Sequence, residues 1–214
     1  MDAAGLTMTK TRRAVILGTG GFAIELHALL ADVSQPVLGF AGPERRSDLP
    51  AAYLGDDGAI AEIGADALFY VAIGDPAIRR RVFERFQQAG RTPAGFVHPA
   101  AYVAPGVDIG AGVIVYPNAT VHGRVRLGAG VVVNSNVSVG HECDIGAFSN
   151  LNPGVALGGR IRMAPGTYVG IGASLLQEIT ICEGVVIGAG ATVTTDIVRP
   201  GTYIGTPARP MRAA

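Results

Sequence analysis

The sequence predicts a small α/β domain followed by a parallel β-helix, and three observations support this fold class. Glycine contributes 31 of 214 residues, about twice its usual share of roughly 7%. The first half alternates short apolar runs with amphipathic segments, as strands and helices around a parallel sheet do. From Val103 to Val193 every sixth residue is Val, Ile, Leu or Met, a period that fits neither an α-helix nor a hairpin.

The α/β domain is expected at residues 12–98, after a flexible tail at 1–11. A short buried-type strand leads into Gly18-Thr19-Gly20-Gly21 and then into a helix with one apolar face. A second helix is predicted after Asp75-Pro76, because Asp caps helices and Pro suits their first turn. The expected strands are 14–17, 36–40 and 68–73, and the expected helices are 22–31 and 77–88.

The β-helix is expected at residues 99–214. Each hexad supplies one short strand and a corner, and three hexads close one coil, so sixteen hexads predict about five coils. Small or β-branched residues such as Ala119 and Cys143 recur four places after the aliphatic ones and are expected to point inward. Glycine often follows the aliphatic residue, as at Gly110, Gly128 and Gly140.

The charge balance excludes several classes of function. Lys and Arg together number 17, as do Asp and Glu, so no net field favours nucleic acid or an anionic membrane surface. Zero net charge also does little to oppose association. The chain has two cysteines, too few for a disulfide framework. No apolar run is long enough to span a membrane, and residues 1–10 lack the apolar stretch of a signal peptide. A cytoplasmic protein is expected.

Four motifs occur in order: Gly18-Thr-Gly-Gly, Ala72-Ile-Gly-Asp, His141-Glu142-Cys143 and Gly205-Thr-Pro-Ala-Arg209. With the hexad period, they resemble the hexapeptide-repeat acyltransferases. The most similar subgroup has a nucleotide-binding domain before the β-helix and includes sialic-acid O-acetyltransferases and nucleotide-sugar N-acetyltransferases. The resemblance implies a left-handed β-helix, acetyl-CoA as co-substrate, a C-terminal coenzyme A loop, and a homotrimer with active sites between subunits.

The spacing Gly18-x-Gly20-x-x-Ala23 after a strand and before a helix resembles a dinucleotide fingerprint, and its backbone N–H groups could hold a diphosphate. A tight strand–helix turn is the alternative. A nicotinamide enzyme would need an acid near the end of the second strand, where this chain has Ala41-Gly42. Relatives that act on UDP-sugars tend to carry an Asp pair there, so its absence leaves room for another base, such as guanine.

His141 is the predicted catalytic residue. Equivalent positions in neighbouring coils are three hexads apart, which places Gly159 over His141. A glycine there would leave open space above the imidazole and expose a backbone N–H. Glu142 is adjacent and could orient the imidazole, unless strand alternation turns the two side chains apart. In the family the matching His is the general base and the matching Glu supports it.

The other reactive side chains are predicted to be structural. His27 and His98 belong to the α/β domain and its connection, and His122 is expected at the surface near the site. Cys143 occupies an inward position, which favours a buried, inert thiol over an acyl-enzyme nucleophile. No His spacing suits a zinc site, so no metal is expected.

The resemblance extends to binding residues. Substrate contacts are expected at Gly20, Gly21, Phe22, Gly74 and Asn134. Acetyl-CoA contacts are expected at Asn150, Gly159, Ile171, Ala189 and Arg209. Gly159 is expected to polarise the thioester carbonyl through its N–H.

The function expected from these features is N-acetylation of a nucleotide-linked 4-amino-4,6-dideoxy sugar, with GDP-perosamine as the expected acceptor. UDP-4-amino-sugar N-acetylation and O-acetylation of the sialic-acid type are the alternatives within the enzymes, since amine and hydroxyl acceptors need the same base. A non-catalytic sugar-nucleotide-binding scaffold and a nicotinamide oxidoreductase are alternatives from other classes.

Overall fold

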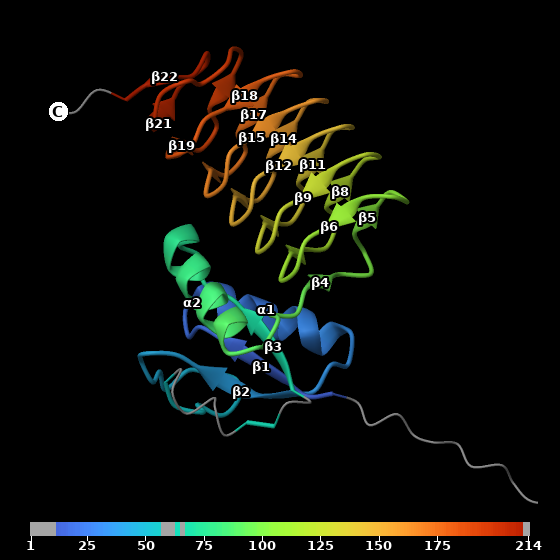
Figure 1. Cartoon of the computed structure of the whole chain (residues 1–214), viewed down its shortest axis with the longest axis vertical. Helices are drawn as coiled ribbons and strands as arrows, with labels where there is room; N and C mark the ends of the chain where they lie inside the picture. Colours follow the sequence, from blue (N-terminus) through green and yellow to red (C-terminus); the bar gives the residue numbers. More distant parts are fainter. Residues whose placement is uncertain (1–11, 57–62, 65–66, 212–214) are drawn as a thin grey trace, which may run out of the picture.

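The computed structural model describes residues 12–56, 63–64 and 67–211. They form an α/β domain and a parallel β-solenoid, and the domain lies beside the first coils of the solenoid (Figure 1). The predicted fold class, an α/β domain followed by a parallel β-helix, is confirmed. The tail predicted at residues 1–11 lies outside the described residues.

The α/β domain contains a parallel sheet of three strands in the order β2-β1-β3. All four residues of β1 are buried, as expected for the central strand of a covered parallel sheet. Asp75 caps α2 by accepting a hydrogen bond from the Ile78 N–H at 2.8 Å, with Pro76 in the first turn. The elements are β1 (Ala14–Leu17), α1 (Gly21–Asp32), β2 (Val37–Ala41), β3 (Leu68–Val71) and α2 (Pro76–Gln88).

The solenoid runs through three sheets in turn, and strands of successive coils pair in parallel with a register of three hexads. Sheet 1 contains β4 (Phe96–Val97), β7 (Ile114–Val115), β10 (Val132–Val133), β13 (Asn150–Leu151), β16 (Tyr168–Val169), β19 (Val185–Ile187), β21 (Gly201–Ile204) and the antiparallel β22 (Arg209–Pro210). Sheet 2 contains β5 (Tyr102–Val103), β8 (Thr120–Val121), β11 (Ser138–Val139), β14 (Ala156–Leu157), β17 (Ser174–Leu175) and β20 (Thr192–Val193). Sheet 3 contains β6 (Asp108–Ile109), β9 (Arg126–Leu127), β12 (Asp144–Ile145), β15 (Arg162–Met163) and β18 (Thr180–Ile181).

The described solenoid has six coils, which begin at β4, β7, β10, β13, β16 and β19. The prediction of about five was one short. Phe96–Val97 precedes the first residue of the counted repeat, yet it pairs with β7. The inward aliphatic residues form one continuous core along the coils.

Two different constraints act at the corners. From Gly106 to Gly190, every sixth residue has a positive φ between 59° and 80°, the left-handed conformation that glycine adopts most easily. The glycines that follow the aliphatic positions have another cause. A Cβ on Gly110 would lie 2.6 Å from the backbone nitrogen of Ala129 in the next coil, so neighbouring coils approach too closely there for a side chain.

The two domains share an interface on sheet 1. Apolar residues of α1 pack with outward residues of this sheet, including Ile114 and Val132. From α2, the buried Arg79 donates to the carbonyls of Gly130 and Phe148 at 2.9 and 2.8 Å. Burial lowers the pKa of Arg79 to about 10. Arg79 fixes the α/β domain to the solenoid, a role with no signal in the sequence motifs.

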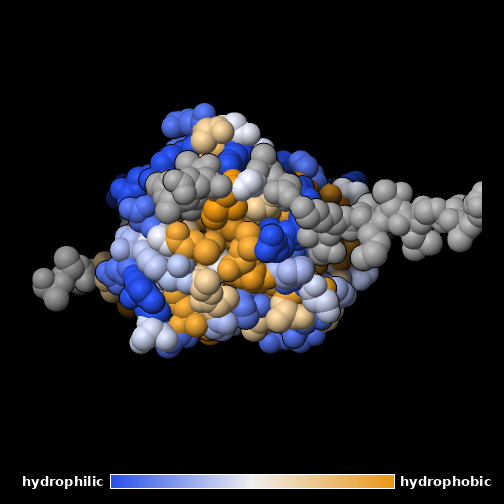
Figure 2. Space-filling view, turned by 90° about the horizontal axis from the view of Figure 1, so that it is seen from below, coloured by the Kyte–Doolittle hydropathy of each residue, from blue (hydrophilic) through white to orange (hydrophobic). Residues whose placement is uncertain are grey.

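The end of the molecule formed by the α/β domain combines an apolar centre with hydrophilic surroundings (Figure 2). In the part of the chain that the structure describes, no helix is long and apolar enough to cross a membrane.

Candidate active site

His141 lies at a corner of the solenoid, directly after β11 in sheet 2 and before β12 in sheet 3. In a three-sided prism, the corner between sheets 2 and 3 is opposite sheet 1. The α/β domain covers sheet 1. His141 and the α/β domain of the same chain are therefore on opposite sides of the solenoid. The His141 side chain is 56% exposed.

His141 and Glu142 interact directly. Glu142 is one of the left-handed corner residues, with φ 61°, and its side chain meets the neighbouring ring instead of turning away. The distance from Nδ1 of His141 to Oε2 of Glu142 is 2.9 Å. An ionised carboxylate only accepts hydrogen bonds, so Nδ1 carries the proton and Nε2 of the neutral ring remains an acceptor.

Gly159 borders the imidazole from the next coil. A Cβ at this position would lie 2.6 Å from Nε2 of His141. The space left by the missing side chain of Gly159, which the sequence predicted to be open, is thus filled in part by the imidazole of His141. Any side chain at residue 159 would displace the ring, so glycine is needed for the observed position of His141.

Two arginines flank the carboxylate of Glu142. Arg124 lies one coil before it, with Nη1 3.4 Å from Oε1, and Arg160 one coil after it, with Nη1 3.8 Å from Oε2. The hydrogen bond with His141, followed by the charge of Arg124, holds the pKa of Glu142 below its ordinary value. Glu142 is therefore a carboxylate at neutral pH.

Cys143 is buried in the solenoid core, and its Sγ donates to the Gly158 carbonyl at 3.2 Å. Burial raises the pKa of its thiol. A protonated, enclosed thiol is a poor nucleophile, which supports a structural role for this side chain.

The glycine-rich turn of the α/β domain lines a pocket of about 480 Å³, here called the glycine-loop pocket. It lies at the carboxyl ends of the parallel strands, where open α/β sheets bind ligands. Added Cβ atoms on Gly20 and Gly21 would meet nothing within 4 Å, so the start of α1 is open to a ligand. The predicted substrate residues Gly20, Gly21, Phe22 and Gly74 all line this pocket, as does Gly42.

Asn134, the fifth predicted substrate residue, lies at the corner between β10 and β11. The register of β7 and β10 places it one coil above Tyr116, whose ring is 6.1 Å from that of Phe22. Asn134 is therefore on the same side of the solenoid as the glycine-loop pocket. Its Oδ1 accepts a hydrogen bond from the Ser135 N–H at 2.7 Å.

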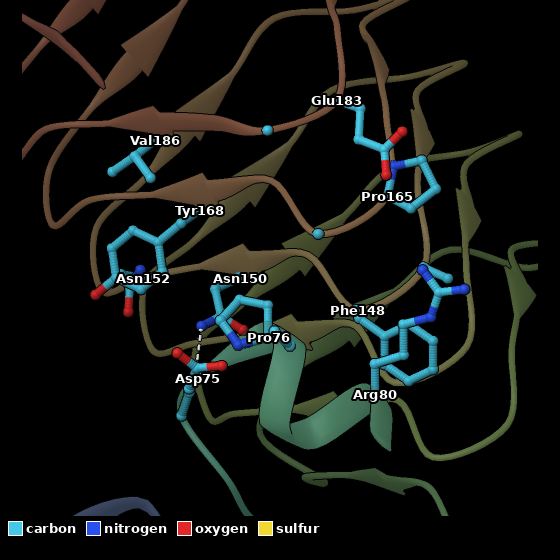
Figure 3. A pocket seen from close by; sticks show the side chains of 15 residues that line it. Asp75, Pro76, Arg80, Phe148, Asn150, Asn152, Pro165, Tyr168, Glu183 and Val186 are labelled. Atoms are coloured by element: carbon cyan, nitrogen blue, oxygen red, sulfur yellow. Dashed lines mark hydrogen bonds between the residues drawn. The ribbon is translucent and has the colours of Figure 1, made fainter. Parts of the chain in front are cut away.

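A second pocket, of about 690 Å³, lies between the start of α2 and strands β13, β16 and β19 of sheet 1. Figure 3 shows Asp75 and Pro76 on one side of it and Asn150, Asn152 and Tyr168 on the other. Asn150 is only 5% exposed. Its amide donates to the Gly74 carbonyl at 2.7 Å and its oxygen accepts from Arg79. The Asn150 side chain is thus engaged in the interface between the domains, which the predicted coenzyme contact did not anticipate.

The other predicted acetyl-CoA residues lie on later coils. Ile171 is 61% exposed and follows Val169 of β16, whereas the exposed Ala189 occupies the same corner one coil further on. Arg209 is exposed on β22, next to β21. These three residues and His141 are separated on the surface of one chain.

Neither His27 nor His98 belongs to a second site. His27 stacks on Phe40 with ring centroids 5.6 Å apart, and Nδ1 of His98 accepts from the Ala100 N–H. Among residues 12–56, 63–64 and 67–211, no group of three or more His, Cys, Asp or Glu side chains could hold a metal ion.

Residues 13–86 match the PglD N-terminal domain family. A comparison of the sequence with curated proteins gives no match.

Solved structures match the α/β domain and the solenoid together. The acetyltransferase domain of PglB from Neisseria gonorrhoeae FA1090, also solved with acetyl coenzyme A, has 29% identity and a TM-score of 0.89, covering 94% of this chain and 100% of that one. A variant of perosamine N-acetyltransferase from Caulobacter crescentus, solved with CoA and GDP-perosamine, has 28% identity and a TM-score of 0.88, covering 94% and 97%. WeeI from Acinetobacter baumannii AYE shares the fold at 22% identity and a TM-score of 0.81, covering 93% and 99%. The expected resemblance to hexapeptide-repeat acetyltransferases is confirmed.

Proposed function

We propose that this protein is an acetyl-CoA-dependent N-acetyltransferase of a nucleotide-linked amino sugar, with His141 as the general base. The observation that carries the proposal is the 2.9 Å contact between His141 Nδ1 and Glu142. It leaves Nε2, on the exposed corner, free to accept a proton, as a general base requires. Acetyltransferases of the same fold add support, since one was solved with acetyl coenzyme A and another with CoA and GDP-perosamine.

The proposed reaction is a direct transfer. The sugar amine attacks the thioester carbonyl, an N–C bond forms, and the amine proton passes to Nε2 of His141. The C–S bond then breaks and CoA leaves, taking that proton as its thiol. The N–H of Gly159 is proposed to stabilise the oxyanion, and Ile171, Ala189 and Arg209 are proposed to contact the coenzyme. Neither a metal nor a covalent acyl-enzyme is part of this scheme.

The sugar nucleotide is proposed to bind in the glycine-loop pocket. Its diphosphate would meet the open N-terminus of α1 at Gly20 and Gly21, where unpaired N–H groups and the helix dipole favour anions. Phe22 and Gly74 line the same pocket. Asn134, one coil above Tyr116, would contact the sugar.

The proposed site needs a second copy of the chain. The glycine-loop pocket belongs to the domain on sheet 1, whereas His141 lies at the opposite corner. A sugar held in the pocket of one chain can meet a base only if another chain supplies it. We propose a homotrimer, a closed assembly in which every pocket faces a neighbouring His141.

GDP-perosamine is the proposed acceptor. Ala41 and Gly42 replace the Asp pair that is typical of UDP-sugar relatives, and the Caulobacter crescentus relative binds GDP-perosamine. A role in the cytoplasmic synthesis of glycan precursors such as O-antigen would follow from that acceptor.

A thiol-release assay tests this function. The protein and acetyl-CoA are offered GDP-perosamine, a UDP-4-amino sugar and a sialic acid in parallel. We expect CoA release with GDP-perosamine and a loss of roughly 10²- to 10⁴-fold in kcat for His141→Ala, the range of a lost general base. His122→Ala, one coil below, is the matched control and should keep most of the activity. Release only with the UDP-sugar or the sialic acid would contradict the acceptor, and release with none would contradict the function.

A further inference from the structure

Four charged residues of alternating sign form a column at the His141 corner. Arg124, Glu142, Arg160 and Glu178 occupy the same corner in four successive coils, and all have a positive φ between 59° and 64°. This conformation repeats at the same point of each coil, so the four side chains emerge one above another. We call them the corner column.

Arg160 lies between two carboxylates but is bonded to only one of them. Its Nε and Nη2 donate to Oε1 of Glu178 at 2.8 and 2.6 Å. Its Nη1 is 3.8 Å from Oε2 of Glu142, too far for a hydrogen bond. That same Oε2 accepts the hydrogen bond from His141 Nδ1.

We propose that Glu178 is a positioning residue, which holds Arg160 away from Glu142 so that the carboxylate remains bonded to His141. This inference rests on the proposed role of His141. Among the described residues, the titratable and charged groups around the Glu142 carboxylate are His141, Arg124 and Arg160. Arg124 approaches the other oxygen, Oε1, and its side chain is 83% exposed. Arg160 is thus the group placed to compete with His141 for Oε2.

The competition has a geometric basis. Without the charge of Glu178, a guanidinium already 3.8 Å from Oε2 gains more from an ion pair with Glu142 than from solvent. The imidazole then loses its fixed tautomer and orientation in a fraction of the molecules. Since all these side chains are partly exposed, the effect has the size of a surface ion pair.

A double-mutant cycle tests the proposal. We expect Glu178→Gln to lower kcat about threefold to fivefold, the upper part of the range of exposed ion pairs, with KM for acetyl-CoA unchanged. Adding Arg160→Gln removes the competitor and should restore kcat. A residue that only supported the fold would not show such rescue, because the double variant would be at least as impaired as the single one.

Asp144→Asn is the matched control. Asp144 pairs with Arg126 across neighbouring coils, as Glu178 pairs with Arg160, but this pair has no contact with Glu142 among the described residues. Asp144→Asn should therefore leave kcat unchanged. An equal loss in Asp144→Asn, an unchanged kcat in Glu178→Gln, or no rescue in the double variant would overturn the proposal. So would a rise in KM for acetyl-CoA alone, which would make Arg160 a coenzyme contact.

Nitrogen NMR of the His141 ring separates this proposal from the proposed function. The signal is assigned by its absence in His141→Ala. We expect the Nδ1-protonated tautomer to decrease in Glu178→Gln and to return in the double variant. If His141→Ala remained active while these spectra changed as expected, the proposed base would be wrong and the positioning role would stand. Unchanged spectra would overturn the positioning role.

Discussion

Cys143 illustrates at the residue scale how burial decides the role of a reactive group. It follows closely after His141 in the chain, but its thiol lies in the core and donates to the Gly158 carbonyl. We predict that Cys143→Ala keeps kcat within about twofold, because a buried thiol with a raised pKa is inert. Steady-state acetyl transfer measures this. Loss of activity together with acetylated wild-type protein in a mass spectrum would contradict it.

Glu142 gives a pH dependence with a definite sign. Its pKa in the folded protein is lower than in the unfolded chain, owing first to the hydrogen bond with His141 and then to Arg124. Its stabilising effect is therefore complete above about pH 5 and is lost as the pH falls through the folded-state pKa.

We predict that Glu142→Gln is less stable than the wild type near neutral pH, and that this difference in stability is smaller at about pH 3. The free energy of unfolding in urea, measured at both pH values, checks this. A difference of the same size at both pH values would show that the loss does not come from the charge of Glu142.

At the scale of elements, the solenoid uses glycine for two reasons, and two substitutions separate them. Gly110 has no room for a Cβ, whereas Gly106 has φ +80° and nothing within 4 Å. We predict that Gly110→Ala destabilises the protein by about 2 kcal/mol through overpacking. Gly106→Asn should cost less than about 1 kcal/mol, because Asn tolerates this conformation, as Asn118 and Asn136 do at other corners of the solenoid. Equal losses of stability in the two variants, measured by thermal unfolding, would contradict these two separate reasons for glycine.

The sequence was most informative about the positions of the helices and strands. The hexad period predicts the strands from Val103 to Val193 because a coil repeats one short pattern, and the predicted helices differ from α1 and α2 by at most one position at each end. The first coil was missed because Phe96–Val97 precedes the counted repeat.

The sequence predicted the site residues whose positions follow from the hexad repeat. It missed the contacts that form between the two domains. The register of the coils places Gly159 beside His141, as the repeat of three hexads per coil required. Neither the engagement of Asn150 by Arg79 nor the burial of Arg79 follows from a period or a motif. Such contacts arise only when α2 docks on the solenoid.

At the scale of the whole molecule, Arg79 holds the two domains together. Arg79→Met would leave the carbonyls of Gly130 and Phe148 without their buried donor, and we predict a loss of about 3 kcal/mol. Arg80→Met is the matched control, since Arg80 forms an exposed pair with Glu84 and should cost less than about 1 kcal/mol. The free energies of unfolding of both variants in urea test this prediction. Equal stability of the two variants would contradict the role of Arg79.

The central claim is that the base and the sugar-nucleotide pocket of one site come from two copies of the chain. Two variants each remove one half. His141→Ala lacks the base, and Gly21→Asp places a carboxylate in the open start of α1, where it repels a diphosphate while suiting a helix N-terminus.

The most direct measurement is acetyl transfer by these two variants, alone and co-expressed in mixed assemblies. Each variant alone should be nearly inactive. In a closed assembly with random mixing, about one quarter of the sites would pair an intact pocket with an intact base, so roughly a quarter of wild-type activity should return. Mixed assemblies as inactive as the separate variants would contradict the claim and place the whole reaction within one chain.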